Sequence, residues 1–192
     1  IESRGHWLDL GSGHGKLIHQ ISNFNPIYYL GLDNDLVALS KARSIIKNRD
    51  WINFLPATLN ENWNSHPMLW GEFPQIKFKY IVANFSLPHY YGDTFWSELN
   101  KYSESGSIFW CNFINEKGKQ GYQNEECYIK TKDQKTEMFF PWCHLKPITE
   151  TFISFDKFQK DISKYNWEIK NKFTPVGSEL DSFYDWYVLV RK

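Results

Sequence analysis

The 192-residue chain has little cysteine, no excess of charge of either sign and no long apolar run. Its 3 cysteines, Cys111, Cys127 and Cys143, form no Cys-x-x-Cys pair, which argues against a disulfide framework or zinc knuckle and favours a reducing intracellular compartment. No segment approaches the roughly 20 apolar residues of a membrane span, so we expect no membrane partner. The 22 Lys and Arg balance the 22 Asp and Glu, which excludes a protein that coats long nucleic acid through unbalanced cations. Contact with a short piece of nucleic acid stays open.

Aromatic residues are abundant, at 18% of the chain, and hydrophobic residues make up 42%. This composition excludes disorder, collagen and coiled coil, and the length fits one domain. We therefore predict a single domain over residues 1–192, with a polar insertion at about 115–137. Because the first residue is Ile and the first motif follows almost at once, we expect this to be the C-terminal piece of a longer polypeptide.

Short apolar runs alternate with segments of helical periodicity in the first part of the chain. We predict strands at 7–10, 27–32, 51–55, 78–83 and 107–111, and helices around 17–21, 36–46 and 94–102. Residues 139–142, 149–153, 167–169 and 184–190 favour extended structure, and 155–165 favour a helix. The alternation predicts an α/β fold with a mostly parallel sheet and right-handed crossovers.

A glycine-rich turn after the first strand is the strongest functional signal. The segment Asp9-Leu-Gly-Ser-Gly-His-Gly15 has the spacing G-x-G-x-G, whereas a dinucleotide fingerprint requires glycine at Lys16. Asp33 follows about 20 residues later, where an acidic side chain can accept both ribose hydroxyls. Asp9 can hold the turn or face a cationic ligand. The alternative is a structural turn with Asp33 as the N-cap of the next helix, a role that Asp35 can also fill.

These motifs resemble those of the class I S-adenosylmethionine-dependent methyltransferases. The resemblance implies a Rossmann-like, mostly parallel seven-stranded sheet with helices on both faces, and S-adenosyl-L-methionine as cofactor. Thr58 falls where the family often has an acidic residue at the adenine. The implied cofactor-binding residues are Asp9, Gly11, Ser12, Gly13, Asp33, Asn34, Thr58, Asn84 and Phe85.

Three later segments resemble the messenger-RNA cap guanine-N7 methyltransferases. Asn84-Phe-Ser-Leu-Pro-His-Tyr90 is similar to their Q-F-x-x-H-Y segment with one extra residue, residues 140–150 to the element that carries a cap-binding glutamate, and residues 184–192 to the last strand of the poxvirus-type subunit. The implied guanine-binding residues are His89, Tyr90, Glu150 and Tyr184. The implied chemistry is methyl transfer to guanine N7 by alignment, with no covalent or acid–base catalytic residue. Separately, His6, His19, His66 and His144 show no metal-ligand spacing, so we expect no metal.

The same resemblance implies the partners. They are the capped 5′ end of messenger RNA and upstream triphosphatase and guanylyltransferase domains of the same polypeptide, and a stimulatory subunit is left open. The chain would act in the cytoplasm, as part of the capping enzyme of a large cytoplasmic DNA virus, in a viral factory or in the virion.

Other interpretations remain open. The chain can be a class I methyltransferase for another small-molecule or protein acceptor. It can also be a non-catalytic binding module, which the absence of acidic residues at Leu17 and Thr58 favours. Glu150 can be a solvated strand residue, and Tyr184 can belong to an aromatic core.

Overall fold

The computed structural model describes residues 4–21, 23, 25–46, 49–65, 73–123, 128–132, 135–140, 148–177 and 181–192. The strands are β1 (His6–Leu10), β2 (Tyr28–Asp33), β3 (Ile52–Pro56), β4 (Tyr80–Ala83), β5 (Ile108–Ile114), β6 (Tyr128–Lys132), β7 (Lys135–Phe140), β8 (Ile148–Phe152), β9 (Trp167–Phe173) and β10 (Tyr184–Arg191). The helices are α1 (Leu17–Ile21), α2 (Leu36–Ile45), α3 (Leu87–Tyr90), α4 (Asp93–Lys101), α5 (Glu116–Gln123) and α6 (Phe155–Lys164), with a 3₁₀ turn η2 (Asp181–Phe183) before β10.

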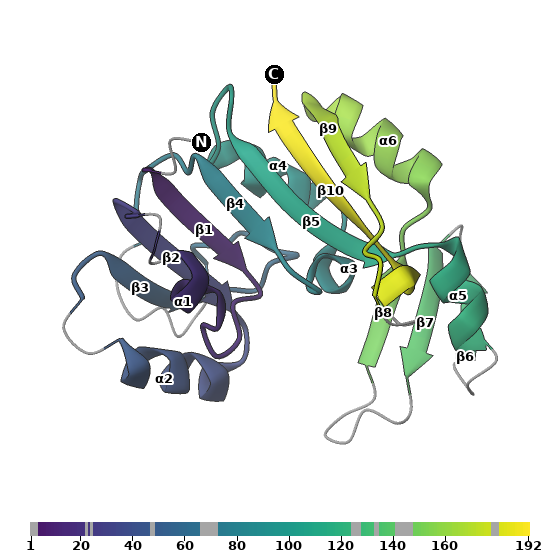
Figure 1. Ribbon diagram of the computed structural model, residues 1–192, viewed down its shortest axis with the longest axis horizontal. Coiled ribbons are helices and arrows are strands. Elements are labelled where there is room, and N and C mark those ends of the chain that lie inside the picture. The colour runs from purple at the N-terminus through teal and green to yellow at the C-terminus, as the bar shows by residue number, and fades with distance from the viewer. Residues whose placement is uncertain are drawn as a thin grey trace.

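Seven strands form the main sheet, in the order β3-β2-β1-β4-β5-β10-β9. Strands β1 to β5 pair in parallel, and β10 runs antiparallel to both of its neighbours. Figure 1 shows β10 pointing against the strands beside it. The predicted mostly parallel sheet is confirmed. The strand order reverses between β1 and β4, and in open α/β sheets ligands bind outside the carboxyl ends of the strands at such a point.

The central strands are buried on both faces, so their apolar residues divide between two cores. In β1, Leu8 and Leu10 join the core that contains residues of α4 and α6, whereas Trp7 joins the core that contains residues of α1 and α2. Helices α3, α4 and α6 lie behind the sheet in Figure 1, and α1 and α2 lie on the opposite side. The predicted cover of helices on both faces is therefore confirmed.

The segment predicted as a polar insertion contains regular structure. It holds α5 and β6 and reaches into β7, and strands β6, β7 and β8 form a separate antiparallel sheet. Helix α5 packs closely against η2, because a Cβ on Gly118 would lie 2.5 Å from the Phe183 carbonyl oxygen. Among the helices that the structure describes, none is both long and apolar enough to cross a membrane.

Candidate functional site

The turn between β1 and α1 uses backbone that glycine adopts most easily. Gly11, Gly13 and Gly15 have φ of 75°, 51° and 73°, in the left-handed region. The Gly11 amide donates to the Leu32 carbonyl at 2.8 Å, which fastens the turn to the end of β2. A Cβ on Gly11 would lie 2.4 Å from Cβ of Ser86, so the absence of a side chain lets the turn meet the loop after β4.

Asp33 and Asp35 divide the two roles that the sequence left open. One Asp33 oxygen accepts from the Gly13 amide at 2.7 Å, and the other accepts from the Asp35 amide at 2.8 Å. Asp35 caps α2, because its side chain accepts from the amides of Val37 and Ala38. Asp33 therefore anchors the glycine turn and is not the N-cap. A carboxylate has about four acceptor positions, so Asp33 keeps capacity for further donors.

Asp9 is buried below the turn, with 4% of its surface exposed. Its Oδ2 accepts a hydrogen bond from the Tyr29 hydroxyl at 2.6 Å. The pKa of Asp9 is raised from 3.8 to about 7, mainly because burial disfavours the charged form; the Asp33 charge adds to this rise and the Tyr29 hydrogen bond opposes it. Asp9 thus bonds to β2, while the turn itself is held by Asp33.

The loop after β4 carries Asn84, Phe85 and Ser86 toward the same edge of the sheet. Phe85 has φ of 54°, and its amide donates to Oδ1 of Asn112 at 2.6 Å. The Ser86 hydroxyl donates to the Leu10 carbonyl at 2.6 Å and lies 2.7 Å from the Tyr90 hydroxyl. These bonds join the end of β1 to the loop after β4, across the point where the strand order reverses.

A cavity of about 810 Å³ opens between these two loops and the segment after β3. That volume falls in the range of small-molecule sites, roughly 300–1,000 Å³. It brings together seven predicted site residues: Gly11, Asp33, Asn34, Thr58, Asn84, Phe85, His89, with Tyr90 as an eighth. The sequence did not single out five further lining residues: Asp35 in this role, Ala57, Leu59, Asn60 and Ser86.

The remaining predicted residues do not line this cavity. Asp9, Ser12 and Gly13 are not among the lining residues. Tyr184 lies beside the cavity, where its ring meets that of Phe85 edge-on, with centroids 5.0 Å apart. Glu150 lies in β8, paired with Met138 of β7, and its side chain falls outside the described residues.

Two further residues shape the site. The Tyr90 hydroxyl donates to the Leu10 carbonyl at 3.2 Å and contacts Ser86, so its polar end faces the end of β1. Asn112 was missed, although a single polar residue within the apolar run of β5 is a signal that could have found it.

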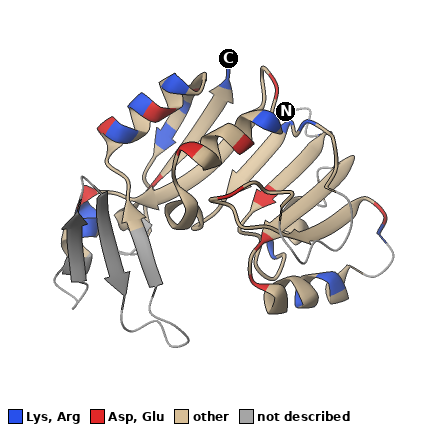
Figure 2. Cartoon of the chain, turned by 180° about the vertical axis from the view of Figure 1, so that it is seen from behind, with Lys and Arg blue, Asp and Glu red and all other residues tan. Residues whose placement is uncertain are grey.

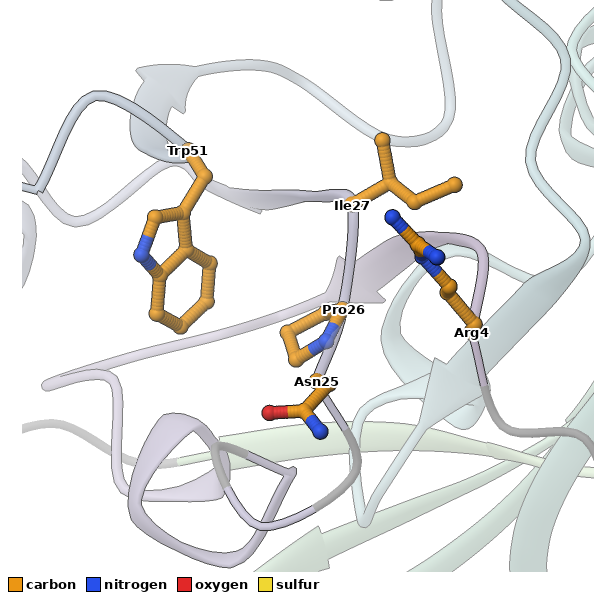
Figure 3. A pocket seen from close by; sticks show the side chains of 5 residues that line it. All are labelled: Arg4, Asn25, Pro26, Ile27 and Trp51. Carbon is orange, nitrogen blue, oxygen red and sulfur yellow. The ribbon is translucent and has the colours of Figure 1, made fainter.

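A second cavity, of about 560 Å³, lies at the opposite edge of the sheet, where β1, β2 and β3 begin. Figure 3 shows its lining residues, Arg4, Asn25, Pro26, Ile27 and Trp51. It contains no predicted site residue. Of the two cavities, the one at the carboxyl edge is therefore the one that predicted site residues line.

Solved structures with the same arrangement include S-adenosylmethionine-dependent methyltransferases. The enzyme from Mesorhizobium loti matches with a TM-score of 0.70 at 16% identity, over 97% of this chain and 91% of its own. The enzyme from Clostridium acetobutylicum matches with a TM-score of 0.66 at 12% identity, over 97% and 83%. The glycopeptide N-methyltransferase MtfA, solved with S-adenosyl-L-methionine, matches with a TM-score of 0.64 at 10% identity, over 98% and 87%.

The fold is that of the class I methyltransferases. The predicted fold class is therefore confirmed. No protein-family model matches the sequence, and no curated protein matches it. At these identities the likeness reaches the class I methyltransferase fold and leaves the acceptor undetermined.

Proposed function

We propose that the chain is a methyltransferase that uses S-adenosyl-L-methionine as its methyl donor. The observation that carries the proposal is the cavity at the strand-order reversal, where a left-handed glycine turn meets an aspartate held at the end of β2. A non-catalytic module can share the fold, but it has no evident need for this tied turn beside an open cavity.

The residues present fit such a cofactor. Gly11 lines the cavity without a side chain, and Asp33 keeps acceptor positions for ribose hydroxyls. Thr58 and Asn60 add polar groups from the segment after β3. The bound cofactor would supply a methyl group on a positively charged sulfur.

We further propose that the acceptor is N7 of the guanine cap of messenger RNA. Phe85 and His89 line the cavity and Tyr184 lies beside Phe85, so three residues of the resemblance meet at one place. The whole chain balances 22 Lys and Arg against 22 Asp and Glu, which suits a short acceptor better than a long electrostatic track, and Figure 2 shows residues of both signs along α6.

Little covalent chemistry is needed from the protein for this reaction. Guanine N7 has an accessible lone pair and carries no proton, so no general base is required. The chain would act by aligning the acceptor, and effective molarities of about 10⁵ M or more show how much positioning can contribute. Glu150 would accept from the guanine N1–H and amino group, and hydrogen bonds to a charged group contribute roughly 1.5–3 kcal/mol. Asp9 and Asp33 would favour positive charge nearby.

The partners and the location follow as part of the same proposal. Capping requires a triphosphatase and a guanylyltransferase before N7 methylation, and we propose that upstream domains of one polypeptide supply them. Viral origin and action in the host cytoplasm belong to this proposal as well.

The test is transfer from radiolabelled S-adenosylmethionine to GpppA and to GTP, with ATP as the control acceptor. We expect label at guanine N7 and none on ATP. Glu150→Ala should lower turnover on GpppA about 100-fold, the scale of about 3 kcal/mol, while cofactor binding stays unchanged. Cofactor binding without transfer to guanine would refute the cap acceptor, and no cofactor binding would refute the activity.

A further inference from the structure

Asn112 is a polar residue in the middle of the otherwise apolar strand β5. Its side chain is fully buried. Oδ1 accepts from the Phe85 amide at 2.6 Å, whereas Nδ2 has no hydrogen-bond partner among the described residues. A buried amide with an unpaired donor destabilises a fold, and a leucine of similar size would avoid that loss. The bond from the Phe85 amide is therefore the contribution of Asn112 that offsets this loss.

The residue that Asn112 binds is in a conformation that its own side chain disfavours. Phe85 has φ of 54°, and the other described non-glycine residues with positive φ are two asparagines, Asn25 and Asn166. Asparagine tolerates the left-handed region, whereas a bulky residue there is an outlier that the surroundings must hold. The short bond from the Phe85 amide to Asn112 is such a restraint.

This conformation places the Phe85 ring between the cavity and β10. The ring lines the cavity and is 51% exposed. It meets Tyr184 at 5.0 Å and Trp186 at 5.8 Å between ring centroids, with interplanar angles of 85° and 86°. Trp186 lies directly opposite Asn112 in the antiparallel pairing of β10 with β5, so the anchor and the rings share one face of the sheet.

We infer that Asn112 is a positioning residue that holds Phe85 in place and so builds an aromatic wall, formed by Phe85, Tyr184 and Trp186, for a planar acceptor ring. This inference rests on the proposed function, because the wall borders the cavity in which the methyl donor would bind. Aromatic side chains bind nucleobases by contact with their rings. The wall thus favours a heteroaromatic acceptor over an aliphatic amine or a carboxylate.

Four variants separate the anchor from the ring and from general destabilisation. Asn112→Leu removes the acceptor oxygen, and Asn112→Asp keeps one. Phe85→Leu keeps the amide and removes the aromatic ring. Cys111→Ala is the matched control, because Cys111 is equally buried in β5 but belongs to the core on the opposite face.

The measurements are hydrogen exchange at the Phe85 amide, the Kd of S-adenosylmethionine, and KM and kcat for GpppA. For Asn112→Leu we expect Phe85 protection to fall about tenfold and KM to rise about tenfold, the scale of one lost hydrogen bond, with the cofactor Kd and kcat within about twofold. Asn112→Asp should keep the protection of the Phe85 amide and the KM for GpppA near their wild-type values. Phe85→Leu should keep the protection of the amide at this position and raise the KM for GpppA. Cys111→Ala should change neither quantity.

Two results would overturn the inference. One is a Phe85 amide that exchanges in the wild type as fast as an exposed peptide. The other is a KM for GpppA that stays unchanged in both Asn112→Leu and Phe85→Leu. Failure of the proposed function looks different, since the wild type would then bind no cofactor or transfer no methyl group, while hydrogen exchange would still decide whether Asn112 holds Phe85.

Discussion

Two loops at the carboxyl edge of the sheet both turn through left-handed backbone, but they do so with opposite kinds of residue. The loop after β1 uses Gly11, Gly13 and Gly15, and Asp33 holds it through the Gly13 amide. The loop after β4 uses Phe85, and Asn112 holds it through the Phe85 amide. In each, a side chain from the neighbouring strand region fixes one amide of the turn.

The difference lies in what each loop presents to the cavity. A glycine turn costs nothing in side-chain clashes and brings its backbone close to a ligand. A phenylalanine in the same region costs about 1–2 kcal/mol in backbone strain but presents a ring. The first loop suits a cofactor that is recognised by close approach, and the second suits an acceptor that is recognised by its flat face.

Substitution of the tightest glycine should have the largest effect. Gly11→Ala would place a Cβ 2.4 Å from Ser86, in a backbone conformation that alanine disfavours, and would separate the two loops. We expect the Kd of S-adenosylmethionine to rise at least about 100-fold, and unfolding stability to fall by more than about 2 kcal/mol. Calorimetry and thermal unfolding measure the two effects.

Gly13→Ala is the control for this prediction. It shares the left-handed backbone, with φ of 51°, but a Cβ there meets nothing within 4 Å. We expect only the backbone cost of about 1–2 kcal/mol. Equal losses for the two variants would show that the contact with Ser86 does not matter.

Removal of the aspartate that ties the glycine turn should come next. Asp33→Ala loses both backbone hydrogen bonds and the acceptor for the ribose hydroxyls. We expect the cofactor Kd to rise about 100-fold, since bonds to a charged group contribute about 1.5–3 kcal/mol each and water replaces part of them. Asp50→Ala removes the same charge from an exposed position at the start of β3 and should leave Kd unchanged; a matching rise there would point to net charge as the cause.

The two loops also differ in how far the sequence predicts them. The glycine spacing and Asp33 lie within one strand–helix–strand unit, so local rules predict the turn and a ligand site beyond the carboxyl ends of the strands. Those rules did not decide between Asp33 and Asp35 as the helix cap, because both stand directly before the predicted helix. Their hydrogen bonds in the structure separate them, since the Asp35 side chain accepts from the first amides of α2 and the Asp33 side chain does not.

The aromatic side of the cavity is assembled from segments far apart in the chain. Phe85, Asn112 and Trp186 come from three different elements, and no spacing rule links them. Pairing of β10 with β5 brings Trp186 opposite Asn112, and this register depends on tertiary packing. The sequence therefore singled out Phe85 and Tyr184 by resemblance but missed Asn112.

Conversion of the aromatic loop into a glycine loop would test the comparison directly. Phe85→Gly relieves the strained backbone but removes the ring. We expect unchanged or slightly higher stability and a KM for GpppA that rises at least about tenfold, because contact with an aromatic ring contributes about 1–3 kcal/mol per base. Steady-state kinetics and thermal unfolding measure these effects. If stability fell by the amount expected for a core residue, the ring would be acting in packing.

The smallest expected effect on cofactor affinity is a dependence on pH that comes from Asp9 at the end of β1. The pKa of Asp9 is raised to about 7, so between its unfolded value of 3.8 and about 7 the folded chain holds a proton that the unfolded chain has released. Stability of the free protein should therefore fall as the pH rises through this window.

A positive sulfur nearby favours the carboxylate, so the affinity for S-adenosylmethionine should rise, by up to about tenfold between about pH 6 and about pH 8. S-adenosylhomocysteine, whose sulfur is neutral, should show a smaller change, and Asp9→Asn should remove both slopes while Tyr29 keeps a hydrogen-bond acceptor. Titration calorimetry of the two ligands across this range measures the difference, and equal slopes for both would mean that Asp9 does not sense the sulfur.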